Sequence, residues 1–419
     1  MNKMNAENNV PAIRFKGFSG EWVSSELGKL LDITSAARVH KNEWTDTGVP
    51  FFRTSDVVSI YKGQENKKAY ISFELYKELS ARSGTVKKDD LLITGGGSIG
   101  IPYLITTIDP MYFKDADLLW LKNTTGTNGY LLFTFFSSPP FRKYINSITH
   151  IGTISHYTIE QAKTTPIHIS KESEEQAKIG NYFQQLDTLI AQHQQKHNKL
   201  LNLKKSLLEK MFPKQGATMP EIRFKSFSEE WEEKNLGSIC DFFRGKHLSW
   251  NDIQSDGNYE CVLYGHLYTD YGMVIKNVNY LTNTNSNNLI RSCSGDVLIP
   301  SSDTTPTGLA RATSIEKNEV ILGGDINILR PKGFLVGSFL SYNINGNRQK
   351  LIKLIKGTTV KHLVNSDLQS VELFIPKKID EQKKITVMFE HLDTLLNQHQ
   401  AQLKKLNNIK QACLEKMFV

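Results

Sequence analysis

The sequence predicts a tandem pair of mixed α/β (α+β) domains, joined by two long helices that pair as an antiparallel coiled coil. Three observations predict this fold. The chain repeats the ends of each half, two tracts carry apolar residues at spacings of three and four, and short β-like runs separated by loops lie between the repeated parts. The repeat also predicts a pseudo-two-fold relation between the halves.

The internal repeat covers the beginning and the end of each half. IRFKGFSGEW at 13–22 returns as IRFKSFSEEW at 222–231, and LDT…QHQ…LLEKMF at 186–212 returns as LDT…QHQ…CLEKMF at 392–418. The copies lie about 206 to 209 residues apart, which is far too long a period for a solenoid. We therefore expect two domains of one design, in which the Trp that closes each opening motif packs against its own domain.

The middles of the two halves do not repeat. Residues from about 35 to 165 and from about 245 to 370 share only scattered positions, such as DLLIT at 90–94 against DVLIP at 296–300. Similar scaffolds with different variable faces suit a protein that reads two different things. We expect four parts: a first domain at 1–165, a first spacer helix at 166–215, a second domain at 216–375 and a second spacer helix at 376–419.

Composition and charge favour a nucleic-acid partner. The chain has 419 residues, of which 39% are hydrophobic and 22% charged, an ordinary globular composition. Its net charge of +8 favours a polyanion, because Lys and Arg displace counterions from a phosphate backbone. No run approaches 18 apolar residues, and the polar start MNKMNAENNV is not a signal peptide. We therefore expect no membrane association. The four cysteines show no CxxC or disulfide pattern, so we expect the reducing cytoplasm; they are Cys240, Cys261, Cys293 and Cys413.

Two Leu-rich tracts predict long helices at 171–212 and 379–418, with no Pro and, after Gly180, no Gly. Each apolar seam needs a partner, and the other helix is the obvious one. An antiparallel pair of about 33 residues would form a rod of about 50 Å with one variable domain at each end. The seam residues are Ile179, Phe183, Leu186, Ile190, His193, His197, Leu200, Leu203, Leu207 and Met211, then Ile385, Phe389, Leu392, Leu396, His399, Leu403, Leu406, Ile409, Cys413 and Met417.

Three seam histidines, His193, His197 and His399, suggest a metal site. No Cys or carboxylate spacing supports zinc, however, and polar seam residues more often fix the register of a coiled coil. We therefore expect no metal.

Each variable region is expected to contain short strands and a helical segment. The helical segments are 130–148, interrupted at its prolines, and 334–355; a Gly-Thr turn follows each, at Gly152–Thr153 and Gly357–Thr358. The strands are expected at 49–57, 89–94, 116–121, 259–264, 295–300 and 324–329.

Two local sequences imitate functional motifs. GGGSIG at 95–100, with Asp115 and Asp117 beyond it, looks like a dinucleotide loop, but Ile101–Pro102 follows where that fold needs a helix. SPPF at 138–141 imitates the catalytic tetrapeptide of DNA amino-methyltransferases, yet no methyl-donor site accompanies it and a helix break is the better interpretation. No GxxxxGKS or GxxxxGKT motif is present. We expect no catalytic residue and no cofactor.

The two variable regions, each followed by a near-duplicate long helix and opened by IRFxxFSxEWxxxxLG, resemble the specificity (S) subunit of a type I restriction-modification system. The resemblance covers essentially the whole chain. It implies that each variable region is a target recognition domain, which reads one half of a bipartite, asymmetric site in double-stranded DNA. It further implies that the helices set the gap between the half-sites and dock two modification (methyltransferase) subunits, to which two restriction (motor-nuclease) subunits add. The S subunit itself does no chemistry.

Base reading needs side chains with donor and acceptor groups that reach the major groove. Polar residues after the expected strands are the candidates, although solvated turn residues are the alternative interpretation of each. They are Arg53, Thr54, Ser55, Asp56, Thr94, Gly96 and Ser98 in the first domain, and Tyr264, His266, Tyr268, Ser301, Ser302, Asp303, Thr304 and Thr305 in the second. Arg142 and Lys143, with Arg348 and Lys350, lie beside the domain helices and suit phosphate contacts, or are ordinary surface charge.

Two other classes of protein stay open. One is a standalone DNA-binding protein of tandem domains, and the other is a self-sufficient enzyme, such as a methyltransferase built on Ser138 to Phe141. A strongly apolar outer face on the helix pair, which needs large partners, would argue against the standalone protein.

Overall fold

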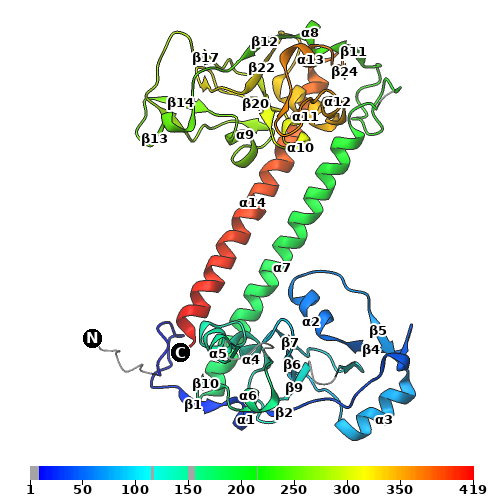
Figure 1. Ribbon diagram of the computed structural model, residues 1–419, viewed down its shortest axis with the longest axis vertical. Coiled ribbons are helices and arrows are strands. Elements are labelled where there is room, and N and C mark those ends of the chain that lie inside the picture. The colour runs from blue at the N-terminus through cyan, green and yellow to red at the C-terminus, as the bar shows by residue number, and fades with distance from the viewer. Residues whose placement is uncertain (1–8, 115–117, 150–155, 215) are drawn as a thin grey trace. The chain divides into compact units, whose positions relative to one another are not determined.

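The computed structural model describes residues 9–114, 118–149, 156–214 and 216–419. The chain forms two compact units, Met1–His193 with Gln402–Val419, and Gln194–Ala401. The long helices α7 (Ser173–Lys210) and α14 (Ile379–Met417) each contribute to both units (Figure 1). The last residues of the chain therefore belong to the unit that contains its first residues.

The first unit is built on an antiparallel sheet in the order β2-β9-β6-β7, with a second sheet in the order β3-β5-β4-β8 and a small sheet of β1 and β10. Its strands are β1 (Val23–Glu26), β2 (Asp32–Thr34), β3 (Trp44–Thr45), β4 (Val49–Phe52), β5 (Ala69–Ile71), β6 (Leu91–Thr94), β7 (Pro102–Leu104), β8 (Tyr112–Phe113), β9 (Leu118–Lys122) and β10 (Pro166–Ile169). Its shorter helices are α1 (Leu27–Leu30), α2 (Thr54–Tyr61), α3 (Phe73–Ser83), α4 (Gly129–Phe135), α5 (Pro139–Thr149) and α6 (Ile159–Lys163).

The second unit repeats this core with an addition. Its main sheet runs β12-β22-β18-β20-β15, in which the first four strands match the order in the first unit; the other sheets are β13-β16-β14-β21-β17, β11-β24 and β19-β23. The strands are β11 (Glu232–Asn235), β12 (Cys240–Arg244), β13 (Ile253–Gln254), β14 (Tyr259–Val262), β15 (Val274–Ile275), β16 (Leu281–Thr282), β17 (Ile290–Arg291), β18 (Asp296–Pro300), β19 (Ser302–Asp303), β20 (Thr313–Ile315), β21 (Ile321–Leu322), β22 (Ile326–Pro331), β23 (Lys361–His362) and β24 (Glu372–Ile375). The shorter helices are α8 (Leu236–Ile239), α9 (His266–Thr269), α10 (Pro306–Leu309), α11 (Gly337–Gly346), α12 (Gln349–Ile352) and α13 (Asn365–Gln369).

The central strands are apolar without alternation because both faces of each sheet are covered. In β6, Leu91 and Ile93 belong to the core beneath α7, whereas Leu92 belongs to a second core on the opposite face. In β18, Val297 and Leu298 divide between two cores in the same way. A strand buried on both faces reads as a continuous hydrophobic run, so the predictions of DLLIT and DVLIP as strands are confirmed.

Two sequence predictions need correction. The strand expected at 49–57 ends at Phe52, and α2 begins at Thr54 because Asp56 accepts the backbone N–H of Arg53 at 2.8 Å, a helix-start arrangement. The helix expected at 334–355 consists of α11 and α12, with Asn347 and Arg348 between them. The break expected at the prolines of 130–148 is confirmed, since α4 ends at Phe135 and α5 starts at Pro139. Gly152–Thr153 lies outside the described residues.

Within each unit, α7 and α14 run antiparallel. In the first unit Phe183 contacts Phe418 with ring centroids 5.9 Å apart, and Asp187 pairs with Lys410; in the second, Phe212 stacks on Phe389 at 6.1 Å. In the second unit Lys204 also pairs with Asp393, so in both units the residue numbers fall along α14 as they rise along α7. The predicted helices and their pairing are thus confirmed inside each unit.

The prediction was wrong for one residue of the seam, which does not face the other helix. Leu203 is 47% exposed, whereas Leu200 and Leu207 pack partly against the core. The reason is the neighbouring Lys204, whose ammonium turns to Asp393 of α14. Adjacent helical residues point about 100° apart, so Leu203 faces away from that contact.

The opening motif of each repeat is anchored to the start of a long helix. Arg14 donates two hydrogen bonds to Glu175, at 2.5 and 2.8 Å, and the indole N–H of Trp22 donates to the same carboxylate at 3.3 Å. Glu381 is bound in the same way, by two hydrogen bonds from Arg223 at 2.7 and 2.9 Å and one from the indole N–H of Trp231 at 3.3 Å. The buried Trp22 and Trp231 confirm that each motif packs against its own domain.

A membrane-spanning helix is not found among the described residues.

Candidate nucleic-acid interface

The first candidate cluster lies at the start of α2, after β4. The Arg53 guanidinium makes two bonds to Asp56, at 2.7 and 3.0 Å, and lies over the ring of Trp44 at 5.5 Å. Asn66, which the sequence did not single out, donates to Asp56 at 2.8 Å and to the exposed Ser55 hydroxyl at 3.1 Å. The carboxylate of Asp56 thus holds the cluster together, and its hydrogen bonds raise the pKa of Arg53.

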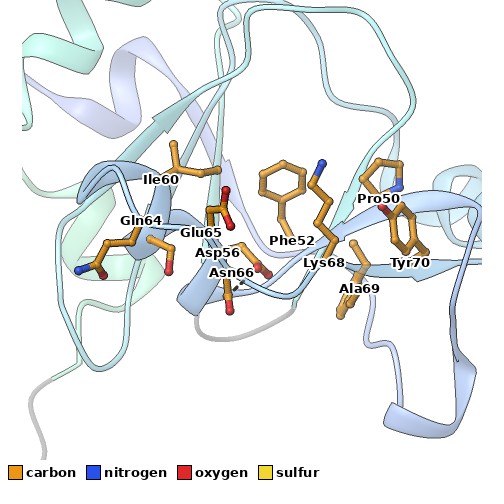
Figure 2. Close-up of a pocket in the computed structure, with 12 residues that line it drawn as sticks. Pro50, Phe52, Asp56, Ile60, Gln64, Glu65, Asn66, Lys68, Ala69 and Tyr70 are labelled. Carbon is orange, nitrogen blue, oxygen red and sulfur yellow. Dashed lines mark hydrogen bonds between the residues drawn. The ribbon is translucent and has the colours of Figure 1, made fainter. Parts of the chain in front are cut away.

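A pocket of about 500 Å³ opens beside this cluster (Figure 2). Phe52, Lys68 and Tyr70 line it together with Asp56 and Asn66, which Figure 2 shows joined by their hydrogen bond. The pocket presents aromatic faces beside hydrogen-bonding groups. Such a surface suits contact with the edges or faces of bases.

The loop after β6 divides into a buried and an exposed part. Thr94 is fully buried; its hydroxyl donates to the Ser98 carbonyl and accepts the Ile101 N–H at 2.9 Å. Gly96 is also buried, whereas Ser98 is exposed. Thr94 and Gly96 therefore shape the loop, and Ser98 is the candidate whose side chain is accessible.

The two basic candidates of α5 differ in their surroundings. Lys143 is exposed. Arg142 is half-buried, and burial lowers its pKa, an effect that the nearby Tyr61 hydroxyl of α2 opposes. Tyr61, whose proximity affects the pKa of Arg142, is the last residue of α2, so the structure brings the α5 candidates near the helix that starts at the Arg53 cluster.

In the second unit, the candidates after β14 fall into three environments. Tyr264 is exposed at 36% of its surface, whereas His266 is fully buried and stacks on Tyr280 at 3.6 Å. The Nδ1 atom of His266 accepts the Leu263 N–H at 3.1 Å, and burial lowers the pKa of the ring, which favours its neutral form. Tyr268 donates to the Ser302 carbonyl at 3.3 Å. His266 thus holds the loop, and Tyr268 reaches the next candidate segment.

The segment Ser301–Thr305 pairs with a strand that the sequence analysis missed. Ser302 faces His362 of β23, with 3.2 Å between the hydroxyl and Nδ1. Ser301 is buried, Ser302 and Asp303 are half-buried, and Thr304 and Thr305 are exposed. Lys361 and His362 therefore join this candidate surface. The sequence signal for this strand was the predicted Gly357–Thr358 turn just before it, where Gly357 has a φ of 108°.

The basic candidates of the second unit lie next to this segment. Helix α10, which follows Thr305, contacts α12, and Arg348 at the start of α12 is exposed. The Lys350 ammonium donates to the Glu372 carbonyl at 2.7 Å, so part of its donor capacity is used within the protein. The structure therefore gathers the second unit's candidates on neighbouring elements.

The imitations of catalytic motifs have structural roles. The buried Ser138 donates its hydroxyl to the Phe135 carbonyl at 2.6 Å, and Phe141 belongs to the core. GGGSIG is followed by strand β7 rather than a helix, while Asp115 and Asp117 lie outside the described residues. Among residues 9–114, 118–149, 156–214 and 216–419, no cluster of His, Cys, Asp and Glu is arranged to hold a metal.

Comparison with known proteins supports the family resemblance that the sequence shows. The family described as "Type I restriction modification DNA specificity domain" matches residues 19–202 and 228–408, one match in each repeat. A candidate type I restriction enzyme specificity subunit of Haemophilus influenzae is 29% identical over 169 residues, which are 39% of this chain and 40% of that protein's own length. The crystal structure of the type I restriction-modification S subunit from M. genitalium has a TM-score of 0.66 at 16% identity, covering 98% of this chain and 99% of that one, and shows the likeness of fold.

Both repeats, the paired long helices and the two matched regions lead to one conclusion. The chain belongs to the family of type I restriction-modification DNA specificity domains, which recognise DNA and are not themselves catalytic.

Proposed function

We propose that this chain is the DNA-recognition subunit of a type I restriction-modification complex, and that each unit reads one half of a bipartite, asymmetric site in double-stranded DNA. The observation that carries the proposal is a shared frame with different surfaces. The Arg14–Glu175 anchor returns as Arg223–Glu381, and the core strand order returns as well. The candidate residues for reading DNA, in contrast, differ between the units.

The contrast is clearest where the main sheet turns. In the first unit a short loop containing Ser98 joins β6 to β7, and in the second a longer connection joins β18 to β20 and contains β19 and α10. Phosphate contacts position a protein on DNA, whereas base contacts specify the sequence. Different connections on one frame therefore support two readers of different half-sites.

We further propose that α7 and α14 set the gap between the half-sites and dock two modification subunits, to which two restriction subunits add. Apolar residues on the helix surfaces support docking over a standalone DNA-binding protein: Leu189 is 43% exposed, Leu203 47% and Val387 64%. Cellular DNA is the target in this proposal, so we expect the complex to act in the cytoplasm. Isolation of the chain from its host with no modification subunit attached would favour the standalone alternative.

The reading function is tested by exchanging residues from about 35 to 165 for the same segment of a relative. Base contacts are worth about 1–3 kcal/mol each, so the exchange is expected to re-specify one half of the methylated sequence and leave the other half intact. Methylome sequencing of the host reads both halves at once. The matched exchange, of residues from about 245 to 370, should alter the opposite half; a joint shift of both halves in either exchange contradicts the proposal.

A further inference from the structure

A basic groove of about 580 Å³ lies in the second unit, between α7 and the variable region. Glu209 is the carboxylate among the described residues that line it. The other polar lining groups are cationic or neutral: Lys204, Lys205, Arg311, Arg348, Gln349, Asn345 and Thr307.

The cations of this groove differ in how far they are neutralised. Lys204 is paired with Asp393. Lys205 and Arg348 are exposed, and within the described part of the chain their side chains have neither a hydrogen bond nor an ion pair. Both are therefore available to an anion.

Arg311 is half-buried without a neutralising carboxylate among the described residues. Its guanidinium donates to the carbonyls of Tyr268 and Tyr271 at 3.3 and 3.4 Å, and lies over the Tyr268 ring at 5.9 Å. Arg carries five N–H donors, so others remain. A cation that is partly removed from water is stabilised by an anion beside it. Because Arg311 lines the groove, an anion bound there can lie beside its guanidinium.

The groove begins where a candidate reading segment ends. The Thr305 hydroxyl accepts the Gly308 N–H at 3.2 Å and starts α10, and Thr307 of that helix lines the groove. A ligand in the groove would thus lie next to any DNA that the Ser301–Thr305 segment contacts.

The matching groove of the first unit has a different charge. It encloses about 1010 Å³ and is lined by Asn407, Lys410, Gln411 and Leu414 of α14, which occupy the repeat positions of Leu201, Lys204, Lys205 and Leu208. Lys410 is paired with Asp187, and Gln411 stands where the second unit has Lys205. The excess of positive charge is therefore a property of the second groove.

We propose that this groove binds neighbouring phosphates of the DNA backbone beside the half-site that the second unit reads, with Lys205, Arg311 and Arg348 as the contacting residues. The inference rests on the proposed reading function. It extends the DNA contact from the variable region onto α7, and such a contact positions the duplex without specifying bases.

The test is the salt dependence of binding to a mixed-sequence duplex by the full chain, alone and with modification subunits, between about 50 and 200 mM salt. The variants are Lys205→Gln, which copies Gln411 of the other repeat, Arg348→Gln, and both together. Each lost phosphate contact is expected to reduce the slope of log K against log salt by about 0.9, and the double variant by about 1.8. Lys199→Gln, about 120° away around the same helix, is the control and should leave the slope unchanged.

The outcomes separate the two proposals. An unchanged slope in the double variant, while the wild-type chain keeps its salt-dependent binding, overturns the groove assignment and leaves the reading function in place. Failure of the wild-type complex to bind any duplex overturns the reading function itself. If the double variant loses its modification subunits at an unchanged slope, the groove docks protein and the phosphate proposal is wrong.

Discussion

Asp187 accepts a hydrogen bond from the Tyr130 hydroxyl at 2.7 Å. Lys410 pairs with the same carboxylate at 2.5 Å, so one aspartate of α7 holds both α4 and α14. The second unit repeats the arrangement with Tyr342, Asp393 and Lys204, and there the Tyr–Asp bond is 3.0 Å long. The aspartate of each LDT motif thus ties the variable region of a unit to the helix pair.

Replacement of Asp187 by Asn is expected to lower the free energy of unfolding by about 1.5–3 kcal/mol, because two charge-assisted bonds are weakened together. Tyr130→Phe should cost about 1 kcal/mol. Burial, strengthened by the bond to Asp187, raises the pKa of Tyr130, so the hydroxyl remains a donor throughout the neutral range. Urea unfolding of the full chain measures both effects.

The matched control is Asp32→Asn. The Asp32 carboxylate is 54% exposed and pairs with the Lys122 ammonium at 3.6 Å. Exposed pairs of this kind contribute about 0–1 kcal/mol. If Asp187→Asn and Asp32→Asn lowered the free energy of unfolding equally, the contacts of Asp187 with Tyr130 and Lys410 would contribute no more than an exposed ion pair.

Glu175 makes the stability of the first unit depend on pH. Burial alone would raise the pKa of Glu175, but the hydrogen bonds from Arg14, Ser170 and Trp22 and the charge of Arg14 hold it below its ordinary value. The unfolded carboxyl has a pKa of about 4.3. The ionised group therefore contributes stability that is complete above about pH 4.3 and is lost as the pH falls through the lower, folded pKa.

Glu175→Gln is expected to lower the free energy of unfolding by about 3 kcal/mol at neutral pH, since it removes the buried carboxylate and leaves the charge of the half-buried Arg14 without its partner. The loss should shrink as the solution is acidified below about pH 4.3. Tryptophan fluorescence during denaturation at several pH values follows it. The neighbouring Glu174→Gln affects only an exposed pair with Lys178 and should change stability by about 0.5 kcal/mol or less; a constant loss for Glu175→Gln at all pH values would refute the assignment.

If α7 and α14 set the gap between the half-sites, as we propose, a longer helix should change the gap of the DNA target. Four residues inserted near the exposed Lys196 of α7 would lengthen the helix by about 6 Å. This is close to two base pairs at about 3.4 Å per step, so the unspecified gap should grow by one or two base pairs while the half-sites stay the same. The added rotation of about 40° partly misaligns the seam and is expected to reduce activity.

Methylome sequencing measures the gap directly. The control is the same insertion after Gly63, an exposed turn of the first unit where the glycine has open space around it. That variant should keep the original gap. If the Lys196 insertion also keeps it at full activity, another element measures the spacing.

The sequence by itself determined the repeat, the two long helices and the positions of the central strands. These features have local and periodic signals: apolar spacing of three and four marks α7 and α14, and uninterrupted apolar runs mark β6 and β18. The polar segments that follow the strands were also visible as candidates. Their division into buried shaping groups, such as Thr94 and His266, and accessible groups, such as Ser98, was not.

Only the tertiary structure decided which distant groups meet. Arg14 and Glu175 are 161 residues apart, and nothing in the local pattern of either residue names its partner. The groove cations Lys205 and Arg311 likewise come from separate segments and have no shared spacing. Burial and pairing depend on the packing of many side chains at once, whereas a sequence pattern reports only the periodicity of one segment, which is why the scaffold could be predicted and the charges around its surfaces could not.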